Sequence, residues 1–122
     1  MLVAAVLVGV AVADPIVGTW EGTSLCQVKS SPCRDEHVLY RFSSEQPRRY
    51  RVDAYKLIAG RQVFMGPIDV MFDRATGQLD GAVVSGTRST GKLRLVLKAG
   101  HMSGSIVLSD GTLYRLIEVD KH

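Results

Sequence analysis

The chain has 122 residues, of which 46% are hydrophobic and 22% are charged, and its formal net charge is +3. This length favours one domain, and the composition is that of an ordinary globular protein rather than a disordered or fibrous one. The small positive charge is far from the signature of a nucleic-acid-binding protein, so we expect no nucleic-acid partner.

Residues 1–13 are wholly apolar and end in Ala11-Val12-Ala13, a small-x-small pattern typical of a signal-peptidase site. A membrane span needs about 20 apolar residues, so we expect no span here. No Lys or Arg precedes the run, although a basic region usually opens a secretory signal. A first strand or an amphipathic N-terminus would need a periodic pattern that the run lacks. We therefore predict a cleaved export signal at 1–13, a mature domain at 14–122, and a secreted or periplasmic protein.

Two cysteines, Cys26 and Cys33, lie seven positions apart on either side of a turn-forming segment, Ser30-Ser31-Pro32. In an exported protein such a pair favours a disulfide. Closing so short a loop stabilises the fold by about 2–3 kcal/mol in the chain-entropy model. The alternative is a metal site that also uses His37, but it needs more ligands than the sequence offers. We predict the disulfide and no metal.

From residue 14 onward the chain reads as short apolar-rich runs that end at turn residues, and no stretch sustains a helical period. The clearest run is 92–98, where Leu93, Leu95 and Leu97 face one way and Lys92, Arg94 and Lys98 face the other. Gly66-Pro67 interrupts another run and predicts a bulge, because proline cannot donate a ladder hydrogen bond. The predicted strands cover residues 16–26, 37–42, 49–58, 62–72, 78–85, 92–98, 102–109 and 112–120.

Short connections join all the predicted strands, so neighbouring strands should be antiparallel. The sequence at Asp110-Gly111 predicts a type I′ hairpin turn, and Gly77 is expected in the left-handed conformation. An eight-stranded meander can close into an up-and-down barrel and remove its exposed edges. The first and last strands would then pair. We expect this pairing to set Arg115 over the indole of Trp20 as a cation–π lid.

The first strand opens with Gly18-Thr19-Trp20, and the last strand carries Arg115. Together with the strand count, this arrangement resembles the calycins, which include lipocalins, fatty-acid-binding proteins, avidins and small bacterial metalloprotease inhibitors. A closer likeness is to small exported lipocalin-like domains. It is carried by the runs at residues 20–26, 33–36, 65–66, 102–104 and 110–115. The resemblance implies an all-β, eight-stranded antiparallel barrel in which Trp20 and Arg115 seal the closed end.

The chain departs from three of these families, each in one respect. Lipocalins are longer and carry a C-terminal helix, and none is predicted after Asp120. Avidins line the biotin site with several tryptophans, whereas this chain has one. Fatty-acid-binding proteins place a two-helix lid after the first strand, where this chain has its cysteine loop. The resemblance therefore supports the fold more than any particular ligand.

Eight strands enclose enough room for packed side chains or for one small ligand. We predict an exported, non-enzymatic protein that binds a small apolar or amphipathic molecule inside the barrel and needs no cofactor. Arg41 or Tyr50 would orient the ligand at the open end. The predicted ligand-binding residues are Tyr40, Arg41, Phe42, Tyr50, Val52, Met65, Leu93 and Leu95.

Two other functions are open at this point. A small exported barrel can act as a protease inhibitor, binding an exported partner protein through residues 14–17 or a loop. An enzyme would need a converging polar cluster, and the run Cys33-Arg34-Asp35-Glu36-His37 is the nearest approach to one. Successive strand residues point to opposite faces, so Glu36 and His37 should diverge. We predict no catalytic residue.

Overall fold

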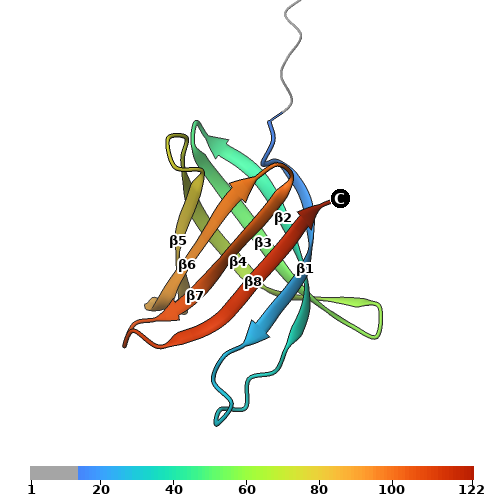
Figure 1. The fold of residues 1–122 in the computed structure, drawn as a ribbon, viewed down its shortest axis with the longest axis vertical. Helices are drawn as coiled ribbons and strands as arrows, with labels where there is room; N and C mark the ends of the chain where they lie inside the picture. The colour runs from blue at the N-terminus through green and yellow to red at the C-terminus, as the bar shows by residue number, and fades with distance from the viewer. Residues whose placement is uncertain (1–13) are drawn as a thin grey trace, which may run out of the picture.

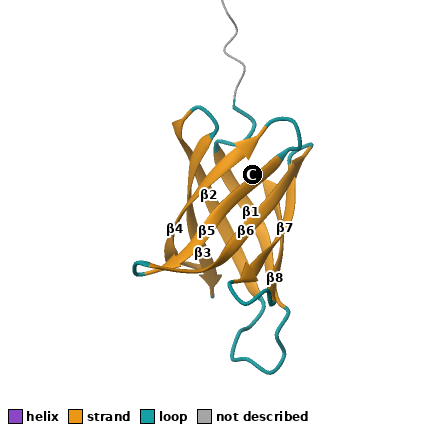
Figure 2. Cartoon of the chain, turned by 90° about the vertical axis from the view of Figure 1, so that its left-hand side faces the viewer, coloured by secondary structure: helices purple, strands orange, loops and turns teal. Residues whose placement is uncertain are grey.

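The computed structural model describes residues 14–122 and shows one closed barrel (Figures 1 and 2). Eight strands follow one another in chain order, each antiparallel to the next, and the last pairs with the first. The predicted all-β up-and-down barrel is confirmed, while the export signal predicted for 1–13 lies outside the described residues. The strands are β1 (Gly18–Cys26), β2 (Glu36–Gln46), β3 (Arg49–Ile58), β4 (Arg61–Asp73), β5 (Gln78–Ser85), β6 (Arg88–Lys98), β7 (His101–Leu108) and β8 (Leu113–Lys121).

Two strands are longer than the sequence predicts. β2 runs on to Gln46, through a segment predicted as a turn, because Ser44 and Gln46 pair with the start of β3. β6 begins at Arg88 rather than after Gly91, because Arg88 pairs with Ser85 of β5. In the β2–β3 and β5–β6 hairpins the paired residues continue up to the turn, and each ladder contains one shift in register. Cross-strand pairing thus overrides the weak strand propensity of these polar segments.

The two turns with specific predictions have different outcomes. Gly77 has a φ of 73°, as predicted. The type I′ turn at Asp110-Gly111 is wrong, because only Gly111 of that pair has a positive φ, of 90°. The Gly111 N–H bonds to the Leu108 carbonyl at 2.9 Å, and Asp110 Oδ1 accepts the Thr112 N–H at 2.9 Å. The aspartate stabilises this turn through its side chain rather than through a left-handed backbone.

The predicted irregularity at Gly66-Pro67 is a β-bulge. Ala54 faces Gly66 and the next residue, Tyr55, faces Phe64, so Met65 is the extra residue in β4. Gly66 has a φ of 122°, a conformation that favours glycine. Beyond the bulge the β3–β4 hairpin leaves the barrel wall and projects to one side (Figure 1).

The disulfide predicted between Cys26 and Cys33 is present. It closes the loop between β1 and β2, which projects from the lower end of the barrel in Figure 1. Asp35 Oδ1 accepts the Cys26 N–H at 2.9 Å, which ties the two ends of the loop together a second time. The loop is thereby held against the ends of β1 and β2.

The backbones of β1 and β8 approach each other closely at Gly22. A Cβ added at Gly22 would overlap the Glu118 carbonyl oxygen, so only glycine allows this close approach. A Cβ at Gly104 would likewise overlap the Arg94 carbonyl oxygen on β6. Side chains fill one half of the barrel interior.

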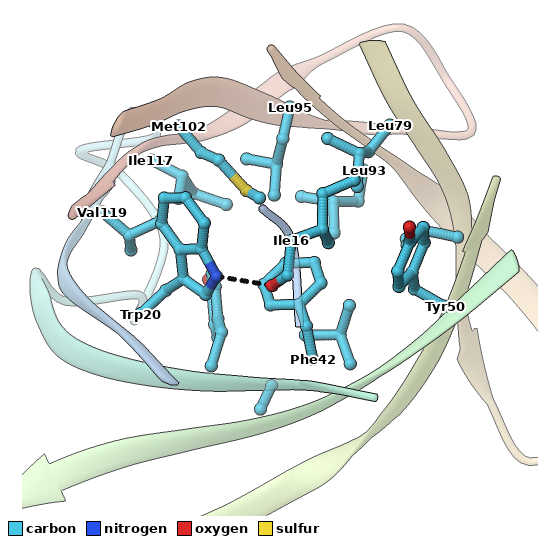
Figure 3. Close-up of a cluster of buried hydrophobic side chains, with 14 of the residues drawn as sticks. Ile16, Trp20, Phe42, Tyr50, Leu79, Leu93, Leu95, Met102, Ile117 and Val119 are labelled. Atoms are coloured by element: carbon cyan, nitrogen blue, oxygen red, sulfur yellow. Dashed lines mark hydrogen bonds between the residues drawn. The ribbon is translucent and has the colours of Figure 1, made fainter. Parts of the chain in front are cut away.

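The filled half lies at the end where β1 begins (Figure 3). Trp20 is fully buried and meets Phe42 in an edge-to-face contact with 6.2 Å between ring centroids. The indole Nε1–H donates to the Ile16 carbonyl at 2.9 Å. Other buried side chains around this pair are Val70, Leu79, Leu93, Leu95, Met102, Ile117 and Val119.

Candidate functional site

Trp20 and Arg115 lie at opposite ends of the barrel. In the β1–β8 ladder Trp20 is opposite Lys121, whereas Arg115 is opposite Cys26. Six residues of strand separate these levels, which corresponds to about 20 Å. The cation–π lid predicted between Arg115 and Trp20 is therefore wrong. Lys121 Nζ lies over the indole at 5.8 Å, and the Arg115 guanidinium lies over the neighbouring Tyr114 ring at 5.0 Å.

The Trp20 end is closed by the segment before β1. Ile16 is only 1% exposed and sits among the core side chains (Figure 3). Asp14 Oδ1 accepts the Ile16 N–H at 2.8 Å, and the Tyr50 hydroxyl donates to Asp14 Oδ2 at 2.7 Å. Lys121 Nζ donates to the Pro15 carbonyl at 2.9 Å. Residues 14–17 thus form a plug that is tied to β3 and β8, and we call them the plug below.

The plug also changes the titration of its partner tyrosine. Burial first, and then the hydrogen bond and the negative charge of Asp14, raise the pKa of Tyr50 to about 12. Tyr50 therefore stays protonated and keeps donating to Asp14 across the physiological pH range. Its hydroxyl is occupied in fastening the plug.

The opposite end of the barrel holds a pocket of about 170 Å³. This volume suits one aromatic ring, since an apolar cavity of about 150 Å³ can hold benzene. It is smaller than the roughly 300–1,000 Å³ of sites for drug-sized molecules. The pocket is lined by apolar residues Ala54, Met65, Ile68, Val83, Val84 and Ile106, by Gly66 and Pro67, and by polar residues Ser24, Glu36, Tyr40 and Arg115.

One side of this pocket lies where β4 and β5 part. These strands pair only from Val70 to Asp73, opposite Gly81 to Gln78. Toward the pocket end the ladder stops, so Ile68 of β4 is not paired with β5 and Val83 of β5 is not paired with β4. Met65 and Val84 flank the same seam and are 43% and 54% exposed. The apolar wall of the pocket therefore reaches solvent between β4 and β5.

The polar wall is built around Arg115, which is 8% exposed. Its Nη1 donates to the Ser24 carbonyl at 3.1 Å and to the Arg34 carbonyl of the disulfide loop at 2.9 Å. The same nitrogen lies 3.2 Å from Glu36 Oε1, and both side chains of this ion pair are mostly buried. The guanidinium therefore joins β1, β2 and the loop, and its charge is offset by Glu36.

Tyr40 lies beside this ion pair and is 5% exposed. None of the side-chain hydrogen bonds within residues 14–122 involves its hydroxyl. Every fully buried side-chain polar atom in that range has a hydrogen-bond partner, so the Tyr40 hydroxyl is accessible from the pocket. Burial, and next the charge of Glu36, raise the pKa of Tyr40 well above its usual range, against an opposing effect of Arg115. Tyr40 thus presents a protonated hydroxyl with no protein partner.

The predicted ligand-binding residues are spread over four environments. Tyr40 and Met65 line the pocket. Arg41 lies on the outer surface, where it donates to Gln62 Oε1 at 3.1 Å and covers the Tyr55 ring. Tyr50 holds the plug at the other end. The remaining four, Phe42, Val52, Leu93 and Leu95, are packed in the core.

Several pocket residues did not stand out in the sequence. Ser24, Glu36 and Ile106 fall on the inward faces of three strands at the level of Arg115. Period-2 alternation assigns each of them to a face, but only the strand register shows that they share a level. The ion pair of Glu36 with Arg115 places Glu36 in the pocket wall.

No protein-family model matches this chain, and no curated protein sequence is significantly similar to it. Within residues 14–122 no group of three or more His, Cys, Asp or Glu side chains is arranged to hold a metal ion. Nor does that part of the chain contain a helix long and apolar enough to cross a membrane. The pocket itself is thus the main guide to function.

Proposed function

We propose that this protein is an exported, non-enzymatic, calycin-like binding protein that holds a small amphipathic molecule at the open end of its barrel. The observation that carries the proposal is the pocket beside Arg115, in which an apolar wall is combined with Tyr40, whose accessible hydroxyl has no protein partner. Apolar walls with a few placed polar groups are the usual form of a small-molecule site.

The packing of the barrel limits the size of the ligand. Trp20, Phe42 and their neighbours fill the half of the barrel interior next to the plug, and the pocket of about 170 Å³ lies in the other half. A ring-sized group would enter the pocket, and the rest of a longer molecule would extend along the β4–β5 seam. Met65 and Val84 would cover that part of the ligand, since both are exposed at the seam.

The Cys26–Cys33 disulfide supports the proposed export. Disulfides persist in oxidising compartments such as the periplasm or the extracellular space and are rare in the reducing cytosol. A secreted or periplasmic location is therefore part of the proposal.

The second candidate function is binding of an exported protein. It is favoured by apolar side chains exposed on the projecting β3–β4 hairpin, where Ile58 is 53% and Phe64 is 50% exposed. A protease inhibitor acting through residues 14–17 is less favoured, because the plug holds these residues against the barrel and buries Ile16. The small-molecule function accounts for the pocket, which the protein-binding function leaves unused.

A dye titration tests the small-molecule function. The uncharged fluorophore N-phenyl-1-naphthylamine should bind with one-to-one stoichiometry and be displaced by a lipid. Val83→Phe fills the pocket and should weaken dye binding at least tenfold. Val96→Phe is the matched control, because Val96 is 37% exposed and lies outside the pocket. Absence of saturable dye binding, or equal weakening by both substitutions, would contradict the proposal.

A further inference from the structure

We infer that the pocket selects an uncharged ligand whose polar end accepts a hydrogen bond from the Tyr40 hydroxyl, such as a ketone, aldehyde, ester or ether. This inference rests on the proposed small-molecule function and names the class of ligand for the same pocket. It follows from three features of the pocket: the free hydroxyl, the balanced charge and the apolar wall.

The free hydroxyl supplies the donor. Tyr40 is 5% exposed, and none of the hydrogen bonds within residues 14–122 involves its hydroxyl. No fully buried side-chain polar atom in that range lacks a partner, so the hydroxyl is accessible from the pocket and can exchange water for a ligand that enters it. Because Tyr40 stays protonated, the partner it lacks is best supplied by an acceptor. A ligand oxygen in the pocket would satisfy this donor.

The charge balance excludes a charged ligand. The two charged side chains that line the pocket, Arg115 and Glu36, already form an ion pair at 3.2 Å. An anion would have to share Arg115 with Glu36, and a cation would meet Arg115 at close range. Lys56 lies 4.0 Å from Glu36, but it is 36% exposed and outside the pocket lining. A charged group entering this site would lose its hydration without gaining a free counter-charge.

The apolar wall favours a compact hydrocarbon body. Ala54, Ile68, Val83 and Ile106 face the space beside Tyr40, and they come from four different strands. Burial against such a wall favours binding, because it removes apolar surface of the ligand from water. The pocket therefore suits a ring or short chain that carries one oxygen acceptor.

Three probes of nearly the same shape test this inference. Acetophenone carries a carbonyl acceptor, α-methylstyrene replaces that carbonyl with an apolar group, and benzoate carries a negative charge. Each would be titrated into methyl-labelled protein while the signals of Ile68, Val83 and Ile106 are followed by NMR. Acetophenone should bind about two- to tenfold more tightly than α-methylstyrene, the range for one neutral hydrogen bond. Benzoate should bind more weakly than both.

Two variants assign the effect to Tyr40. Tyr40→Phe should remove the advantage of acetophenone and leave the affinity for α-methylstyrene within about twofold. Tyr55→Phe is the matched control, because Tyr55 stacks on Phe64 outside the pocket lining. Circular dichroism would check that both variants fold, which is expected because neither hydroxyl supports another residue.

The outcomes separate this inference from the proposed function. If benzoate binds most tightly at the pocket methyls, the ligand class is wrong while the small-molecule function stands. If acetophenone and α-methylstyrene bind equally, and Tyr40→Phe changes neither affinity, the role of Tyr40 is wrong. The small-molecule function would still stand. If none of the probes, nor the dye, moves the pocket signals, both the inference and the proposed function fail.

Discussion

The Tyr50 hydroxyl donates a 2.7 Å hydrogen bond to Asp14 Oδ2, which joins β3 to the residues that precede β1. Ile16 lies two positions after Asp14 and is buried over the core. The barrel is thus closed at one end by its own chain rather than by a separate lid. The pocket beside Arg115 and Tyr40 lies at the other end.

Asp14→Asn should change how stability depends on pH. Burial raises the pKa of Asp14, but hydrogen bonds from the Ile16 N–H, the Tyr50 hydroxyl and the Val17 N–H, together with the charge of Lys121, lower it below the ordinary 3.8. A lowered pKa in the folded state means that ionised Asp14 stabilises the fold above 3.8. This stabilisation is lost as the pH falls through the folded-state pKa.

The measurement is urea denaturation of the wild type and Asp14→Asn at steps between about pH 5 and pH 2. The free energy of unfolding of the wild type should fall more steeply over the lower part of this range. Asp73→Asn provides a comparison at a carboxylate that lies in an exposed hairpin. Parallel curves for the wild type and Asp14→Asn would show that the plug carboxylate has no such role.

Trp20→Ala should lower the free energy of unfolding by about 3–5 kcal/mol, because a fully buried aromatic side chain is replaced by a cavity. Trp20 has 0% exposure and packs on both Phe42 and the plug. Chemical denaturation followed by far-ultraviolet circular dichroism would give this value. A loss below about 1 kcal/mol would mean that Trp20 does not organise the filled half of the barrel.

Arg115→Met should lower the free energy of unfolding by about 2–4 kcal/mol, because it leaves Glu36 without its counter-charge in a mostly buried site. The carbonyls of Ser24 and Arg34 lose a donor at the same time. Arg94→Met is the matched control, since the Arg94–Asp80 pair is 62% and 47% exposed. The control should cost less than about 1 kcal/mol, and equal losses would refute the structural importance of the buried pair.

Replacing both Cys26 and Cys33 by serine should lower the free energy of unfolding by about 2–3 kcal/mol. The reason is that the unfolded chain regains the freedom that the closed loop removes. Free-thiol titration of the folded wild type should detect no reactive thiol, since both cysteines of residues 14–122 are bonded to each other. Detection of two thiols in the folded protein would contradict the disulfide.

The strands could be located from the sequence because their signal is local. In the run at 92–98 the alternation of Leu93 and Leu95 with polar neighbours assigns each side chain to a face without any knowledge of its partner strand. Turn residues then separate the runs, and short connections give the antiparallel order. The barrel closure follows from the number of strands and the need to cover their edges.

The position of each residue along the barrel axis could not be predicted in this way. Trp20 and Arg115 were expected together because the first and last strands pair, but antiparallel pairing brings the start of β1 to the end of β8. The pocket depends on two further non-local facts: the register that aligns Glu36 with Arg115, and the short β4–β5 ladder. Neither leaves a pattern within a single run of residues, whereas the bulge beside the pocket could be predicted from Gly66-Pro67.

The short ladder between β4 and β5 has a consequence for self-association. A closed barrel normally offers no strand edge, yet here the parts of β4 and β5 beside the pocket have none of their residues paired with each other. Free edges are templates on which a second chain can add a strand. Pro67 has no N–H to offer such a chain, and the bulge at Met65 bends the edge away from a straight register. The chain thus keeps its pocket open to solvent while making that opening a poor site for fibril growth.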